Sequence, residues 1–198
     1  MNRNSTLLPV IGLIVALTAV GFGWYSMNKM PDNAFPEFEL AFNLHSADGP
    51  VSFNDSKGKV GLLFFGYAHC PDVCPATMVN FGRALDMLNE SERSKVNALF
   101  ISLDSQRDTP EIMKKYVGFF HPEITGLTGS VDEIEAASKS FLIAFEKDKA
   151  NAIGNYSMNH STYIFITRPD GGLGNLISHK SSPEEIVEVL RHWMKWAD

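Results

Sequence analysis

Two largely apolar segments separated by one amphipathic helix constrain the fold of this chain more than any other feature. Residues 60–67 (VGLLFFGY) form a continuous apolar run, which is typical of a strand buried on both faces, and residues 96–103 are predicted to be a second buried strand. A helix is predicted between them, at residues 75–88. Its apolar residues recur at spacings of three and four on one face: Met78, Phe81, Leu85 and Leu88. Two strands joined through a helix lie parallel, so the sequence predicts a βαβ unit at the centre of an α/β fold.

Shorter patterns on both sides of this unit complete the predicted fold. Strong turn formers at residues 47–50 close a leading β-hairpin made of residues 38–44 and 51–53. The other predicted elements are helices opening at Asp108 and near Val131, strands at 141–146, 161–167 and 173–178, and a last helix after Pro183. A βαβ unit followed by a hairpin and a terminal helix is the thioredoxin-like arrangement.

A separate apolar segment lies near the amino terminus. Residues 7–25 carry no charged side chain and would cover roughly 28 Å as a helix, close to the roughly 30 Å hydrocarbon core of a bilayer. The run exceeds the apolar region of a secretory signal, and Trp24 and Tyr25 suit a membrane interface, so an uncleaved anchor is favoured over a cleaved signal. We therefore expect a cytoplasmic tail at 1–6, a transmembrane helix at 7–25, a linker at 26–36 and one folded domain at 37–198.

The short leading tail and the lack of an Arg- and Ser-rich presequence predict a bacterial inner-membrane protein with its domain in the periplasm. The formal net charge of −6 argues against nucleic acid as a partner, because no basic surface would neutralise phosphates. Only two cysteines are present, Cys70 and Cys74. In an oxidising compartment such a pair is by default a disulfide, and this alternative stands beside any chemical role.

The two cysteines lie in the sequence HCPDVCP, residues 69–75, between the first apolar strand and its helix. Each precedes a proline, which disfavours the α conformation and predicts an irregular loop with Pro75 as the first helical residue. The positive end of the helix favours thiolate, the form that acts as nucleophile and as metal ligand. Two soft thiolates suit Cu(I), with zinc and iron–sulfur clusters as alternatives, although two cysteines exclude any four-cysteine site.

Strand direction predicts a third ligand for such a site. The cysteine loop leaves the C-terminal end of a parallel strand, and an antiparallel strand beginning at Ser161 would start at the same sheet edge, directly after His160. Two thiolates and one imidazole suit Cu(I) and also accept Cu(II). Asp104 follows the second parallel strand at this edge, so we expect it to hydrogen-bond the site or a partner, with a solvated turn residue as the alternative. Asp108 is expected to cap its helix.

Three segments resemble the Sco/SenC family of copper proteins: HCPDVCP, ISLDSQRDTPE at 101–111 and YSMNHSTYIFITRPDG at 156–171. The resemblance implies a thioredoxin-like fold that binds copper, as Cu(I) and Cu(II), through Cys70, Cys74 and His160. It also implies a role in building the binuclear copper centre of cytochrome c oxidase. Asn159 departs from the family pattern, which has an aspartate there, and this removes a carboxylate beside the predicted histidine ligand.

The sequence therefore predicts a membrane-anchored metallochaperone that is not an enzyme. It would receive copper from a donor protein, deliver it to cytochrome c oxidase subunit II, and depend on a thioredoxin-like reductant. The alternatives are a thiol–disulfide oxidoreductase that uses Cys70 and Cys74 as a redox pair to reduce the cysteines of that centre, and a redox or copper sensor. His160 separates these functions, because dithiol exchange needs only the two cysteines.

Overall fold

The structure is a computed structural model that describes residues 39–150 and 155–196, which belong to one compact unit, Phe38–Asp198. Its elements are, in chain order, β1 (Asn43–Ser46), β2 (Gly49–Ser52), the 3₁₀ helix η1 (Phe53–Ser56), β3 (Val60–Gly66), α2 (Val73–Asp86), α3 (Glu90–Arg93), β4 (Val96–Ser102), α4 (Pro110–Gly118), β5 (Ile124–Leu127), α5 (Val131–Ser140), β6 (Phe145–Lys147), β7 (Met158–His160), β8 (Tyr163–Thr167), β9 (Leu173–Ser178) and α6 (Pro183–Met194).

The predicted tail, transmembrane helix at 7–25 and linker lie outside the described residues. Within residues 39–150 and 155–196, none of the helices has the length and apolar character needed to cross a bilayer.

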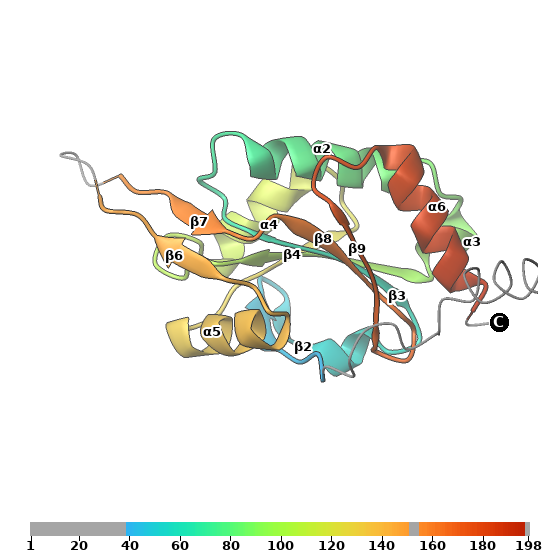
Figure 1. The fold of residues 1–198 in the computed structure, drawn as a ribbon, viewed down its shortest axis with the longest axis horizontal. Helices are drawn as coiled ribbons and strands as arrows, with labels where there is room; N and C mark the ends of the chain where they lie inside the picture. The colour runs from blue at the N-terminus through green and yellow to red at the C-terminus, as the bar shows by residue number, and fades with distance from the viewer. Residues whose placement is uncertain (1–38, 151–154, 197–198) are drawn as a thin grey trace, which may run out of the picture. The chain divides into compact units, whose positions relative to one another are not determined.

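A five-stranded sheet forms the centre of the unit, in the order β5-β4-β3-β8-β9 (Figure 1). β3 runs parallel to β4, and β4 runs parallel to β5, whereas β8 is antiparallel to both β3 and β9. This confirms the predicted βαβ unit and the later hairpin. The strand β5 was not predicted, because its four residues include Thr125 and Gly126 and do not form a continuous apolar run.

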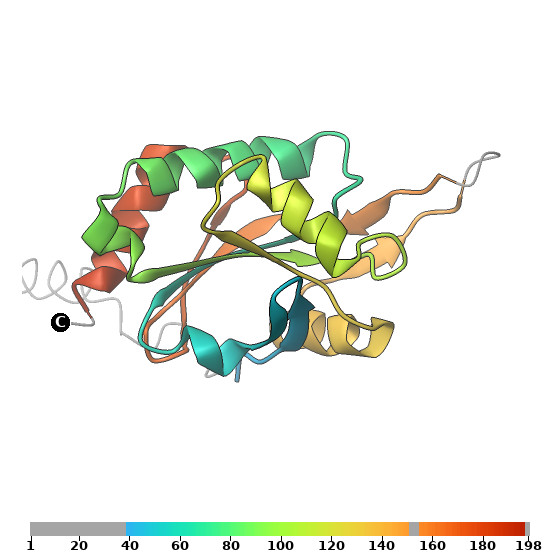
Figure 2. The same cartoon turned by 180° about the vertical axis from the view of Figure 1, so that it is seen from behind.

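Two hydrophobic clusters pack against the two faces of this sheet. In β3 every residue is buried, and successive side chains alternate between them: Leu62 and Phe64 join one cluster, and Leu63 and Phe65 join the other. Helices α2, α4 and α6 cover the first face, while α5, η1 and the β1–β2 hairpin cover the second (Figure 2). The central strand is thus held from both sides, and its C-terminal end leads directly into the cysteine loop.

The start of α2 differs from the prediction. The helix begins at Val73, so Cys74 and Pro75 lie in its first turn, and only Cys70 remains on the irregular loop. The N–H groups of a first helical turn have no partner within the helix, so a proline at the third position sacrifices no hydrogen bond. The conformational bias against α at Cys74 is therefore overcome when the helix packs on the sheet.

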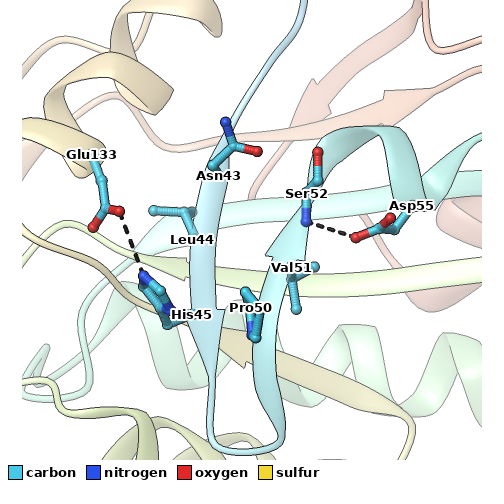
Figure 3. Close-up of a pocket in the computed structure, with 8 residues that line it drawn as sticks. All are labelled: Asn43, Leu44, His45, Pro50, Val51, Ser52, Asp55 and Glu133. Carbon is cyan, nitrogen blue, oxygen red and sulfur yellow. Dashed lines mark hydrogen bonds and ion pairs between the residues drawn. The ribbon is translucent and has the colours of Figure 1, made fainter.

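The leading hairpin is present, but its strands are displaced toward the turn: β1 covers 43–46 instead of 38–44, and β2 covers 49–52 instead of 51–53. β1 pairs with β2 in antiparallel register. A shallow pocket borders this hairpin (Figure 3). Beside it, His45 Nε2 lies 3.5 Å from Glu133 Oε1 of α5, and the Ser52 backbone N–H donates to Asp55 at 2.7 Å. These contacts join the hairpin to α5 and to η1, so the polar residues beside the pocket stabilise the fold. None of the predicted site residues lines the pocket.

The segment that carries His160 also differs from the prediction. Phe141 caps α5 instead of opening a strand, and Leu142 adopts a φ of +54°, which reverses the chain. β6 then pairs with β7, in which His160 is opposite Phe145, as a separate two-stranded sheet. β8 starts only at Tyr163. His160 therefore ends a short hairpin strand of its own and does not lie directly before the central sheet strand.

Candidate metal centre

The cysteine loop places two free thiols close together in different environments. Cys70 is half-buried, and its backbone N–H donates to the Tyr67 carbonyl at 3.2 Å. Cys74 is fully buried beneath it in the first turn of α2. The Cys74 backbone N–H donates to Cys70 Sγ at 3.5 Å, so the helix N-terminus supplies a donor to this sulfur. The pair is not a disulfide in this structure.

The environments of the two thiols drive their proton affinities apart. The pKa of Cys70 falls to about 5, chiefly because the Cys74 thiol donates a hydrogen bond to its sulfur, with backbone N–H groups and the Tyr67 hydroxyl adding to this effect against burial. The pKa of Cys74 is raised, because its thiol is that donor, because it is buried and because the Cys70 thiolate is close. At neutral pH, Cys70 is thus a thiolate and Cys74 a thiol.

This difference predicts that the rate of Cys70 alkylation, plotted against pH, has its inflection at low pH. Thiolate is the reacting form, so the rate with iodoacetamide should rise through about pH 5 and level off, whereas an ordinary thiol continues to gain rate through about pH 8.5. Peptide mass spectrometry gives the rate at each site. In Cys74→Ala the inflection should move upward, since the main donor is gone. An inflection near pH 8.5 in the parent chain would contradict the assignment.

His160 ends β7 beside the C-terminal end of β3. Its ring packs edge-on against Phe64 of β3 and against Tyr67, with centroid distances of 6.3 Å to each. Its Nδ1 lies 2.9 Å from the Ser161 carbonyl oxygen, which fixes Nδ1 as the donor and leaves the Nε2 lone pair unprotonated. Burial lowers the pKa of His160, which favours the neutral ring that binds metals.

The structure brings the three predicted ligands to the same end of β3. The charge on Cys70 acts on His160, and Tyr67, which hydrogen-bonds Cys70, also contacts the His160 ring. Among the residues that the structure describes, no three or more His, Cys, Asp and Glu side chains are grouped so that they could hold a metal ion. Ligation by Cys70, Cys74 and His160 therefore stays a prediction.

Asp104, the predicted outer-shell residue, is buried and contacts other groups than the thiols. Its carboxylate accepts hydrogen bonds from Arg107 Nε and from the Tyr156 hydroxyl, the latter at 2.7 Å. Burial and the bond to Asp104 raise the pKa of Tyr156 to about 12, so the phenol remains a donor. Because Tyr156 lies next to β7, Asp104 is linked to the hairpin that carries His160.

Asp108 has a different role from the helix cap that was predicted. Thr109 caps α4, and its hydroxyl accepts from the Ile112 N–H. Asp108 is buried, and its Oδ2 accepts from the Ala68 backbone N–H at 2.9 Å and from the Ser102 hydroxyl at 2.6 Å. Two adjacent capping residues precede the helix, and only one can occupy the cap, so the other is free to bind the cysteine loop.

Two histidines near the site also differ in what they contact. His69 is half-exposed, and its Nδ1 lies 3.4 Å from Asp108 Oδ1, so it faces the carboxylate beneath the loop. His179 follows β9 and is close enough to His160 to help lower its pKa. The His179 Nδ1 lies 3.2 Å from the Thr162 carbonyl. Only the pairing of β9 with β8 reveals this proximity.

Comparisons with known proteins find relatives along most of the chain. The family model described as SCO1/SenC matches residues 31–195. The mitochondrial SCO2 homolog of Bos taurus is 35% identical over 197 residues, which cover 92% of this chain and 74% of the bovine protein. The mitochondrial SCO2 protein of Saccharomyces cerevisiae is 33% identical over 159 residues, covering 77% of this chain and 53% of the yeast protein. The chain thus spans about half the length of that yeast relative.

A solved structure is similar over nearly all of the described unit. Bradyrhizobium japonicum ScoI with copper bound is 36% identical and superposes with a TM-score of 0.72, covering 77% of this chain and 97% of ScoI. This likeness confirms the predicted thioredoxin-like α/β fold. In ScoI, this fold binds copper.

Proposed function

Because the chain belongs to the SCO1/SenC family, we propose that it is a copper chaperone that takes up one copper ion through Cys70, Cys74 and His160. The observation that supports this most directly is a pair of free thiols beside an imidazole. The Cys74 backbone N–H donates to Cys70 Sγ at 3.5 Å, and the His160 ring contacts Tyr67 at the same end of β3. Copper is the cargo of this site and not a resident catalyst.

The ligand chemistry fits copper in both oxidation states. Two thiolates are soft ligands that suit Cu(I), and an imidazole nitrogen makes Cu(II) acceptable as well. Cys70 is already deprotonated, whereas Cys74 must lose its proton to become a ligand, so copper uptake should release protons. His160 needs no deprotonation, because burial already favours its neutral form.

The proposal extends to partners and location, which the family resemblance supports. The recipient would be the binuclear copper centre on cytochrome c oxidase subunit II, and a separate donor protein would supply the metal. A thioredoxin-like reductant would keep Cys70 and Cys74 reduced, since a disulfide cannot bind copper. Residues 7–25 would anchor the chain in a bacterial inner membrane, with the domain facing the periplasm.

A second function, thiol–disulfide oxidoreductase, is favoured by one specific observation. A half-exposed thiolate of low pKa next to a buried thiol is the arrangement of an attacking and a resolving cysteine. Cys70 would attack a partner disulfide, and Cys74 would then attack the mixed disulfide, which releases the reduced partner and leaves a Cys70–Cys74 disulfide. This activity would be compatible with copper transfer.

A competition titration tests the chaperone function. The reduced full-length chain, titrated anaerobically with Cu(I) against a chelator, should retain one equivalent of copper. Alkylation of both cysteines should abolish this retention, because it removes both sulfur ligands. Retention that survives alkylation, or a reduced chain that holds no copper, would contradict the proposal. Rapid turnover of a model disulfide by the copper-free chain would favour the oxidoreductase function.

A further inference from the structure

The hairpin that carries His160 is structurally separate from the central sheet. β6 and β7 pair only with each other, and they extend away from the five-stranded sheet (Figure 1). A histidine on such a hairpin keeps a fixed position relative to Cys70 and Cys74 only if other contacts hold the hairpin. The described contacts that do so include the buried side chain of Met158 and a hydrogen bond from Lys147 to Gln106 at 2.8 Å. The largest group of polar contacts lies around Tyr156, two residues before β7.

Tyr156 is stacked between two cations from different parts of the chain. Arg107 Cζ lies 3.6 Å from the centre of its ring, and Lys147 Nζ lies 3.7 Å from the same centre. Lys147 belongs to β6, within the hairpin, whereas Arg107 belongs to the segment between β4 and α4. Cations at these distances are attracted to the ring face. The stack therefore joins the hairpin to the main body of the fold.

Hydrogen bonds also join Tyr156 to the main body of the fold. Arg107 donates through NH1 to the Tyr156 carbonyl at 3.1 Å and through Nε to Asp104, and the Tyr156 hydroxyl donates to the other Asp104 oxygen at 2.7 Å. Asp104 is only 3% exposed, so these charge-assisted bonds are shielded from water. We call the four residues Asp104, Arg107, Lys147 and Tyr156 the clamp. It connects two segments that resemble Sco/SenC proteins, 101–111 and 156–171.

The clamp also lies close to the proposed ligands. Arg107 Cζ is 5.8 Å from the centre of the Tyr67 ring, and Tyr67 is the residue that contacts both the His160 ring and the Cys70 sulfur. Tyr156 precedes His160 by only four residues, so a shift of Tyr156 would move β7. The clamp is therefore placed to set the position of His160 without contacting it.

We propose that Arg107 and Tyr156 are positioning residues for copper, because the clamp holds the β6–β7 hairpin so that His160 faces Cys70 and Cys74. This inference rests on the proposed copper-binding function. Its main consequence concerns oxidation state. Cu(I) is satisfied largely by the two thiolates, whereas Cu(II) depends more on the imidazole, so a loosened hairpin should weaken Cu(II) binding selectively.

The test is Arg107→Met in the full-length chain, which removes the cation and its hydrogen bonds but keeps the length of the side chain. Affinity for Cu(II) should fall about 10- to 100-fold, the range typical of lost outer-shell support, while affinity for Cu(I) should change by less than about threefold. In electron paramagnetic resonance, the nitrogen hyperfine signal of Cu(II) should weaken. Arg191→Met is the matched control, because Arg191 of α6 also forms hydrogen bonds to a carboxylate, that of Glu92, and should leave all these values unchanged.

A double-mutant cycle separates positioning from a general loss of stability. In a His160→Ala background, Arg107→Met should cause no further loss of Cu(II) affinity, since the group it positions is already absent. If Arg107→Met lowers the melting temperature, Lys147→Met at an exposed residue of β6 provides a second test. Tyr156→Phe should retain most of the Cu(II) affinity, because its ring still stacks with Arg107 and Lys147.

Different results would overturn different proposals. If Arg107→Met weakened Cu(II) equally in the presence and absence of His160, or had no effect in a copper-binding parent, the clamp proposal would be overturned while the copper function stood. A parent chain that binds neither Cu(I) nor Cu(II) would overturn the proposed function itself, and the positioning role with it.

Discussion

Replacing His160 by alanine should lower the affinity for Cu(II) by more than about a hundredfold, because loss of a direct ligand must exceed the roughly 10- to 100-fold effect of losing outer-shell support. The affinity for Cu(I) should fall less, since both thiolates remain. The His160 side chain is only partly buried, so the fold should persist. Competition titrations with each ion measure the two affinities separately.

His45→Ala is the matched control for this prediction. His45 is also a histidine in a short hairpin strand, but it is exposed and pairs with Glu133 of α5 (Figure 3). Its loss should leave copper affinity unchanged. If His160→Ala bound both ions as tightly as the parent chain, the three-ligand site would be wrong, and the two cysteines alone would have to explain any copper binding.

Replacing Asp108 by alanine should destabilise the described unit by about 3 kcal/mol. The Ala68 N–H and the Ser102 hydroxyl would both lose their acceptor inside the protein, and each unsatisfied buried donor costs about 1–3 kcal/mol. Urea denaturation measures the change in unfolding free energy. Because Asp108 holds the backbone just before the cysteine loop, the alkylation rate of buried Cys74 should also rise in Asp108→Ala. If the free energy of opening that exposes Cys74 falls by about 1.4 kcal/mol or more, this rate should rise by more than about tenfold.

Asp108→Asn distinguishes the lost hydrogen bonds from the lost charge. The amide oxygen can still accept from the Ala68 N–H and the Ser102 hydroxyl, so this variant should be clearly more stable than Asp108→Ala. A loss below about 1 kcal/mol for Asp108→Ala would show that the loop does not depend on this carboxylate. Equal losses for the two variants would instead assign the stabilisation to the pairing with His69.

Several parts of the site could not be predicted from sequence, and the reasons are physical. DTPE at residues 108–111 contains two residues that can each cap a helix, and only packing decides that Thr109 does so while Asp108 binds the cysteine loop. The stacking of Arg107 on Tyr156 joins residues 49 positions apart, and no local pattern encodes such a contact. The approach of His179 to His160 depends on the register of β9 against β8.

The sequence by itself determined the central βαβ unit, the cysteine pair between its first strand and helix, and the later antiparallel hairpin, because burial periodicity and turn residues are local properties. It also indicated that Cys70, Cys74 and His160 would approach one end of the sheet. Only the tertiary structure decided that His160 lies on a separate hairpin, that Cys70 carries the thiolate, and that Asp104 and Arg107 hold Tyr156. These features depend on contacts and burial between distant segments, which exist only once the chain has folded.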